Sequence, residues 1–227
     1  LMVLIYLLGG LGILIKNYDK LGSIFNLIIT DAFTGNAVVG GIVGEVIRQG
    51  IRRAVFSNEA GLGTEVMAHG AAKTKEPVRE GLVAMIGPFI DTILVCSITA
   101  FAILVSGVWN DPALNGVSMT AKAFSNELGL LGEFILFFSV FTFSVTTMFG
   151  QSYYGAKCTG FLFGSRWKVN YNWFYVLSTI FGATVSISIV INLIDGMYAI
   201  MAIPTMVSTI LLAPKVMKET RRYFSMI

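Results

Sequence analysis

The sequence has few charged residues, two cysteines and one histidine. Asp, Glu, Lys and Arg make up 13% of its 227 residues, whereas roughly 25% of a soluble domain is charged. Cys96 and Cys158 fall in or beside apolar runs without the spacing of a metal site, so we expect buried free thiols. With His69 as the only histidine, a site built from two histidines is excluded, and we expect no transition-metal site.

The motifs of common enzyme classes are also missing. The sequence contains no P-loop, no HExxH and no nucleophile elbow with a histidine partner. Its net charge of +3 is too small for a nucleic-acid-binding surface. We therefore expect neither an enzyme, nor an organic cofactor, nor a nucleic-acid partner.

Long apolar runs dominate what remains. Hydrophobic residues make up 55% of the chain, and its mean hydropathy is +0.76. We predict an all-α, polytopic membrane bundle of about six spans, together with a re-entrant or interfacial helix over residues 21–33 and a short surface helix over 118–128. The clearest spans cover residues 81–107, 130–158, 173–189 and 193–212. Because residues 1–14 are short for a span, we interpret the chain as a fragment whose beginning is missing.

Basic residues cluster after positions 73, 157 and 215, whereas the loop around Asp111 and Glu127 is acidic or neutral. The positive-inside rule then places the C-terminus in the cytoplasm. Arg48, Arg52 and Arg53 do not fit this pattern, and we expect them to snorkel or to line an aqueous vestibule.

The segment that does not fit a plain membrane helix is residues 54–73, AVFSNEAGLGTEVMAHGAAK. Ser57 and Asn58 compete for backbone hydrogen bonds, and two glycines, Gly61 and Gly63, disfavour helix by about 1 kcal/mol each. We predict a helix broken over residues 56–63. Backbone groups freed in a membrane must face protein or water, and such groups suit a zwitterion and a monovalent cation. Glu59 lies in this break, and it either braces the break structurally or lines an ion pathway.

Other polar residues fall inside apolar runs. Asp91 follows Pro88, and we expect it to act as a structural partner. Thr146 and Thr147 offer hydroxyls that suit sodium, although such residues also pack helices. Gln151, one turn beyond Thr147, adds an amide. We predict a helix junction near residues 192–196, with capping or surface roles for Asn192 and Asp195. We also expect His69 to be solvated, on a half-helix that Pro77 stops.

The chain resembles the alanine or glycine:cation symporter family, and the resemblance covers nearly its whole length. Three stretches carry it: residues 56–63, FSNEAGLG, followed by 68–74, AHGAAKT; residues 91–100, DTILVCSITA; and residues 150–155, GQSYYG. Where family members often have Trp, this chain has Gln151, which could enlarge the pocket.

The resemblance implies the second half of a LeuT-like 5+5 inverted repeat, in which the first helix of each repeat is broken at the substrate site. Residues 1–227 would then be one transporter domain whose N-terminal half of the repeat is missing. The implied site residues are Phe56, Ser57, Asn58, Gly61, Thr147 and Gln151 for the amino acid, Thr146 and Thr147 for sodium, and Glu59 and Asp91 as structural or gating residues.

The function implied by the resemblance is sodium-coupled symport of a small neutral amino acid, such as alanine or glycine, across the plasma membrane by alternating access. The expected partners are that amino acid, sodium, the lipid bilayer and the missing half of the transporter. Two alternatives stay open. One is a channel or non-transporting membrane subunit that uses the same polar break, and the other is an intramembrane enzyme with Glu59 and Asp91 as an acid pair.

Overall fold

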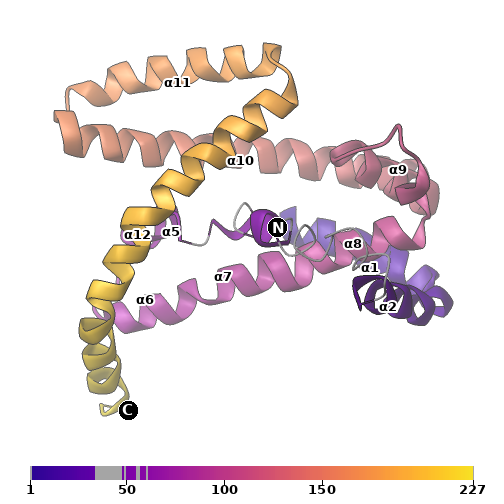
Figure 1. Ribbon diagram of the computed structural model, residues 1–227, viewed down its shortest axis with the longest axis horizontal. Coiled ribbons are helices and arrows are strands. Elements are labelled where there is room, and N and C mark those ends of the chain that lie inside the picture. The colour runs from indigo at the N-terminus through magenta and orange to yellow at the C-terminus, as the bar shows by residue number, and fades with distance from the viewer. Residues whose placement is uncertain (1, 34–47, 49, 55–56, 60, 227) are drawn as a thin grey trace. The chain divides into compact units, whose positions relative to one another are not determined.

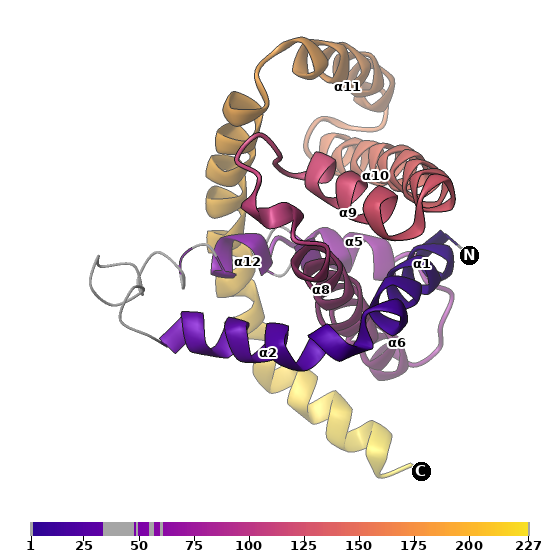
Figure 2. The same cartoon turned by 90° about the vertical axis from the view of Figure 1, so that its right-hand side faces the viewer.

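The computed structural model describes residues 2–33, 48, 50–54, 57–59 and 61–226. The described residues form helices joined by turns and contain no strand, which confirms the predicted all-α class. Figures 1 and 2 show the helices in two views. The chain divides into two compact units, Leu1–Ile51 with Phe89–Thr147 (unit 1) and Arg52–Pro88 with Met148–Ile227 (unit 2).

Unit 1 has an apolar core. It contains α1 (Met2–Lys16), α2 (Tyr18–Phe33), the π-helix η1 (Phe89–Cys96), α8 (Ser97–Val105), the 3-10 helix η2 (Val108–Asn110), α9 (Val117–Leu128) and the start of α10 (Leu130–Phe163). The Tyr6 ring stacks on Phe124 with centroids 5.5 Å apart, and its hydroxyl lies 2.6 Å from the Thr99 hydroxyl. Ile13, Ala102 and Leu136 complete the buried cluster.

The sharp bend between α1 and α2, 96° in size, is held by Asn17. This side chain is 6% exposed, and its amide donates to the Ile13 carbonyl at 3.1 Å and to the Glu127 carboxylate at 2.8 Å. The ammonium group of Lys16 lies 3.4 Å from the same carboxylate. Figure 2 shows α2 leaving α1 at this angle, so residues 21–33 do not extend the first helix as a straight span.

One local expectation changes in unit 1, and one helix takes an unusual form. The helix predicted at the surface, α9, buries Ala123 and Phe124 completely, because its apolar face packs against α1 and α8. Beyond Pro88 the helix continues as the π-helix η1, with Asp91 in its first turn. Proline lacks an N–H donor and disfavours regular α-helix around it, and π-turns are one way in which a helix accommodates this.

Unit 2 contains α5 (Thr64–His69), α6 (Pro77–Ala84), α7 (Ile86–Pro88), the end of α10, α11 (Trp167–Thr184) and α12 (Ile187–Phe224). The helix junction predicted at residues 192–196 is wrong. The chain breaks earlier, at Val185 and Ser186, and then continues as one helix through Pro204 and Pro214. Ser186 is extended, which lets the chain turn, whereas helix can continue through 192–196 because these residues include only one helix-disfavouring glycine.

Three helical stretches are long and apolar enough to cross a membrane: Pro77–Val105, Leu130–Phe163 and Ile187–Phe224. The bent pair of α1 and α2 would make four. This is fewer than the six or so spans expected, counted over the described residues. Cys96 and Cys158 form no disulfide and are exposed, which corrects the prediction of buried thiols. Both lie on apolar helices with many exposed hydrophobic side chains, which lipid covers in a membrane protein.

Candidate functional site

The predicted helix break is present in unit 2. Ser57 and Asn58 are helical, Glu59 leaves the helix, and α5 begins at Thr64. Gly61 and Gly63 have φ angles of +79° and +83°, a left-handed conformation that glycine adopts without steric cost. Phe56, the first residue of the predicted break, lies outside the described residues. Backbone N–H and C=O groups at this break are thereby removed from helical pairing.

Glu59 has a left-handed backbone, with φ at +52°, and it is the one non-glycine residue described with positive φ. Such a conformation costs a non-glycine residue about 1–3 kcal/mol and persists where surrounding contacts fix it. Here the Gln151 amide on α10 donates to the Glu59 carboxylate at 3.0 Å. The structure therefore brings two predicted site residues together, and their contact holds the strained corner of the break.

Thr205 of α12 closes the other side of the break. Its hydroxyl donates to the Gly61 carbonyl, and a Cβ added to Gly63 would lie 2.9 Å from the Thr205 methyl group. Gly63 is thus required both by its φ angle and by the close approach of α12. The sequence did not single out Thr205, since a threonine in an apolar helix is ordinarily a packing residue.

Arg52 pairs with α12 on the N-terminal side of the break. Its guanidinium forms an ion pair with the Asp195 carboxylate and donates to the Asn192 side chain at 3.4 Å. Asp195 therefore pairs with Arg52 instead of capping a helix junction, whereas Asn192 is exposed, as its predicted surface role requires, and also contacts Arg52. The sequence feature that could have predicted this pair is the charge of Asp195 in an apolar helix, because an ionised residue within a membrane helix normally has a partner of opposite sign.

Thr64 is a further polar residue that the sequence did not single out. It is 3% exposed, and its hydroxyl has no hydrogen-bond partner among the described residues. A buried hydroxyl without a partner is costly, and this one lies at the first residue after the break. It adds an oxygen to the backbone groups that the break sets free.

The predicted sodium ligands lie on α10. Thr146 and Thr147 are exposed, and the Thr146 hydroxyl donates to the carbonyls of Thr142 at 2.9 Å and Phe143 at 3.0 Å. Since these bonds use its proton, the Thr146 oxygen keeps lone pairs for another partner. Both threonines belong to unit 1 and the break belongs to unit 2, and Asp91 is likewise in unit 1.

His69 ends α5 and contacts α6. Its Nδ1 lies 2.7 Å from the Glu80 carboxylate, beside a cavity of about 410 Å³ that is also lined by Glu65 and Pro77. His69 is thus paired rather than simply solvated. Pro77 starts α6 instead of stopping the half-helix, because proline fits the first turn of a helix. No cluster of metal-ligating side chains occurs among the described residues.

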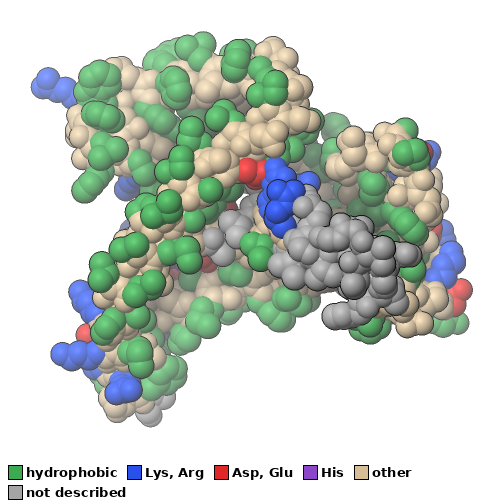
Figure 3. Space-filling model, viewed as in Figure 1, with side chains coloured by type: hydrophobic (Ala, Val, Ile, Leu, Met, Phe, Trp, Pro, Cys, Tyr) green, Lys and Arg blue, Asp and Glu red, His purple; other side chains and the backbone are tan. Residues whose placement is uncertain are grey.

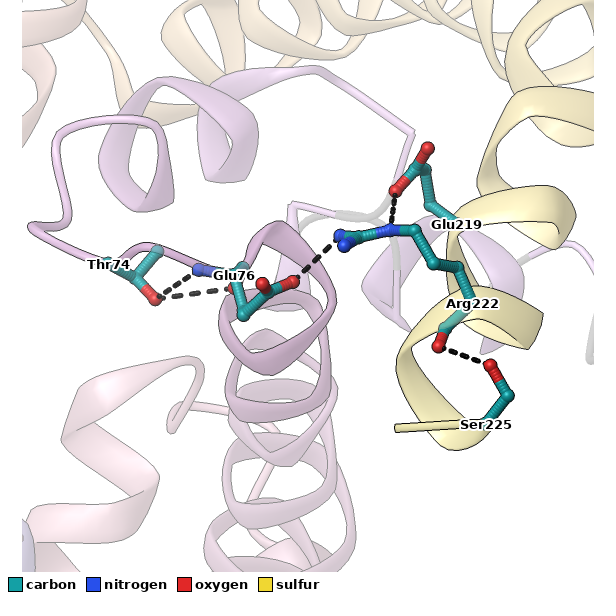
Figure 4. A network of polar contacts seen from close by, with 5 residues as sticks. All are labelled: Thr74, Glu76, Glu219, Arg222 and Ser225. Atoms are coloured by element: carbon teal, nitrogen blue, oxygen red, sulfur yellow. Dashed lines mark hydrogen bonds and ion pairs between the residues drawn. The ribbon is translucent and has the colours of Figure 1, made fainter. Parts of the chain in front are cut away.

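Polar contacts at three places join α12 to the segment around the break, and successive positions along α12 contact successive positions along that segment. Asp195 binds Arg52, Thr205 binds Gly61, and farther along Arg222 donates to the Glu76 carboxylate at 2.8 Å. Figure 4 shows this last link, in which Arg222 also binds Glu219 at 2.7 Å. Helix α12 therefore contacts residues before the break, within it and after it.

Known proteins resemble the chain over its whole length. Residues 1–227 match the model of a family described as the sodium:alanine symporter family. A Methanococcus maripaludis protein named sodium/alanine symporter AgcS is 39% identical over 98% of this chain and 49% of its own length. An uncharacterized transporter of Haemophilus influenzae is 36% identical, over 98% and 50%. A probable sodium/glutamine symporter of Bacillus subtilis, GlnT, is 30% identical, over 98% and 47%. The chain spans about half the length of these curated relatives.

Proposed function

Because the chain belongs to the sodium:alanine symporter family, a family of secondary transporters and not of enzymes, we propose that it takes part in sodium-coupled symport. The substrate is a small neutral amino acid such as alanine or glycine, carried across the cell membrane by alternating access. The observation that carries this proposal is the helix break between Asn58 and Thr64, fixed on one side by Gln151 and on the other by Thr205.

The break supplies what an amino acid requires. Ser57, Asn58 and Gly61 contribute polar side chains and backbone groups; Phe56, the fourth residue that the resemblance implies here, lies outside the described residues. The α5 helix begins at Thr64, and the N-terminal end of a helix favours a carboxylate. Gln151 contributes its amide, while Glu59 serves as a brace whose carboxylate is already held.

Sodium binds, in this proposal, to the hydroxyls of Thr146 and Thr147. Sodium is a hard cation that prefers oxygen ligands, and the Thr146 oxygen retains lone pairs because its proton is used within α10. In a LeuT-like arrangement, which the resemblance implies, the remaining ligands come from the broken helix of the other repeat. The C-terminus is cytoplasmic in this arrangement, as the basic residues after position 215 favour.

The size of the substrate is the least constrained part of the proposal. Gln151 takes the place of a bulkier aromatic residue often found in the family, and one relative is named as a glutamine symporter. A polar residue here leaves space for a side chain longer than that of alanine. Uptake should therefore be measured with alanine, glycine, serine and glutamine in parallel.

The proposal is tested by measuring the uptake of labelled amino acids into proteoliposomes, first with an inward sodium gradient and then with potassium in place of sodium. Saturable uptake with sodium alone, together with counterflow, is the expected result, since a carrier shows counterflow and a pore does not. Uptake that never saturates would favour the channel alternative, and absence of uptake with every amino acid would refute symport of these substrates.

A matched pair of variants tests the sodium ligands. Replacing Thr147 by Val keeps shape but removes the hydroxyl, and we expect the sodium concentration for half-maximal uptake to rise about ten-fold, the equivalent of one lost hydrogen bond to a charged group. Thr142→Val is the control, because the Thr142 hydroxyl donates to the Phe138 carbonyl within α10. Unchanged sodium activation in Thr147→Val with normal expression would contradict the assignment.

A further inference from the structure

A groove between α6 and the C-terminal part of α12 is separate from the helix break. Its volume is about 690 Å³, and its walls include Leu82 and Met85 from α6 and Leu212 and Val216 from α12. The lining also includes two charged residues of α12, Lys215 and Glu219. The groove thus combines an apolar wall with one basic and one acidic side chain.

The groove lies where two candidate spans leave the membrane. The span Pro77–Val105 begins at α6, and the apolar part of the span Ile187–Phe224 ends near Leu212. Residues 187–212 form about 39 Å of helix, whereas the hydrocarbon layer is roughly 30 Å thick. Because Lys215 is the first charged residue after this apolar run, we expect it at the level of the lipid headgroups and the apolar wall beside the acyl chains.

The charges around the groove leave a cationic surplus. Both nearby carboxylates, Glu76 and Glu219, are bound by Arg222, at 2.8 and 2.7 Å. Within the described part of the chain, the side chains of Lys215, Lys218 and Arg221 show no ion pair or hydrogen bond. Figure 3 shows Lys and Arg side chains (blue) over this end of α12.

We propose that the groove binds one anionic phospholipid, with an acyl chain along the wall of Leu82, Met85, Leu212 and Val216 and the phosphate on the Lys215 ammonium group. Basic residues just beyond a membrane helix attract anionic headgroups, and Arg222 keeps the Glu219 carboxylate from repelling the phosphate. The apolar wall explains why the ligand is a lipid and not a soluble phosphate. The inference does not rest on the proposed transport function.

The first experiment is native mass spectrometry of the purified protein, titrated with phosphatidylglycerol and with phosphatidylcholine. We expect one phosphatidylglycerol to be retained in preference to phosphatidylcholine. Lys215→Gln should weaken its binding about five-fold, the equivalent of one basic contact near an anionic surface. Lys218, one turn from Lys215, does not line the groove, and Lys218→Gln removes the same charge there. Phosphatidylglycerol should therefore bind this variant within two-fold of the unchanged protein.

The second variant acts on the wall of the groove. Gly81 lines it, and a Cβ added there meets nothing within 4 Å, so we choose Gly81→Leu to reduce the volume of the groove, with thermal unfolding as the check that the variant is folded. Binding of phosphatidylglycerol should fall although Lys215 is intact, and inorganic phosphate should not displace the lipid. Equal losses in Lys215→Gln and Lys218→Gln would show general surface attraction and overturn the proposal, as would full retention in Gly81→Leu or displacement by phosphate.

Discussion

Each of the two units is stabilised internally, and the kind of contact that stabilises it differs between them. Unit 1 is built around Tyr6, Ile13, Ala102, Phe124 and Leu136. In unit 2, Leu62 is the one apolar residue described as buried, and its helices are connected by hydrogen bonds and ion pairs from α10 and α12. A packed apolar core has few alternative arrangements, whereas separate polar links can be broken and remade. We therefore expect the core of unit 1 to contribute more to stability than any contact in unit 2, which contains the helix break of the proposed amino-acid site.

The largest effect should come from Phe124, which is fully buried in unit 1. Phe124→Ala should lower the free energy of unfolding by about 3–5 kcal/mol, because it removes apolar contacts and leaves a cavity. Phe137→Ala is the matched control, since Phe137 is 71% exposed. Thermal unfolding of the purified protein in detergent measures both, and equal midpoints would contradict an apolar core in unit 1.

The contact between Glu59 and Gln151 should show a coupling of about 1.5–3 kcal/mol, the range for a hydrogen bond to a charged group. A double-mutant cycle with Glu59→Ala and Gln151→Ala, each of which removes one partner of the hydrogen bond, measures it through the uptake rate. We expect each single variant to lose most of the coupled effect and the double variant to lose little more. Additive losses would show that the two side chains act separately and that Gln151 does not brace the break.

Gly63→Ala should cost about 1–2 kcal/mol from its left-handed backbone alone, and the new methyl group would crowd Thr205. Uptake should fall at least ten-fold at equal expression. Gly196→Ala, also in unit 2, has open space around its Cβ and should have little effect. If both alanine variants transported equally well, the close approach of α12 to the break would be disproved.

The smallest effect is expected at Arg52, whose side chain is 33% exposed while that of Asp195 is 23% exposed. Because the pair is only partly buried, Arg52→Gln should cost no more than about 1 kcal/mol and should change uptake more than unfolding. Arg53→Gln controls for charge, since Arg53 is exposed and has no ion pair or hydrogen bond within the described residues. Equal uptake in both variants would show that the ion pair between Arg52 and Asp195 makes no specific contribution to transport.

The sequence by itself determined the local features. Low charge and high hydropathy established the membrane class, and Gly61 and Gly63 located the break, because glycine preferences act on the backbone within a few residues. The family motifs indicated the symporter family, which the comparisons confirmed. The substrate and sodium ligands and the inverted repeat stay predictions.

Only the tertiary structure decided which residues meet. Arg52 and Asp195 are 143 positions apart, and Thr205 and Gly61 are 144 apart, so no local pattern could pair them. The sequence could not show that Phe124 is buried or that the chain turns at Ser186 and not near Gly196. The physical reason is that burial and pairing depend on which helices approach one another, whereas helix breaks depend on the backbone preferences of neighbouring residues.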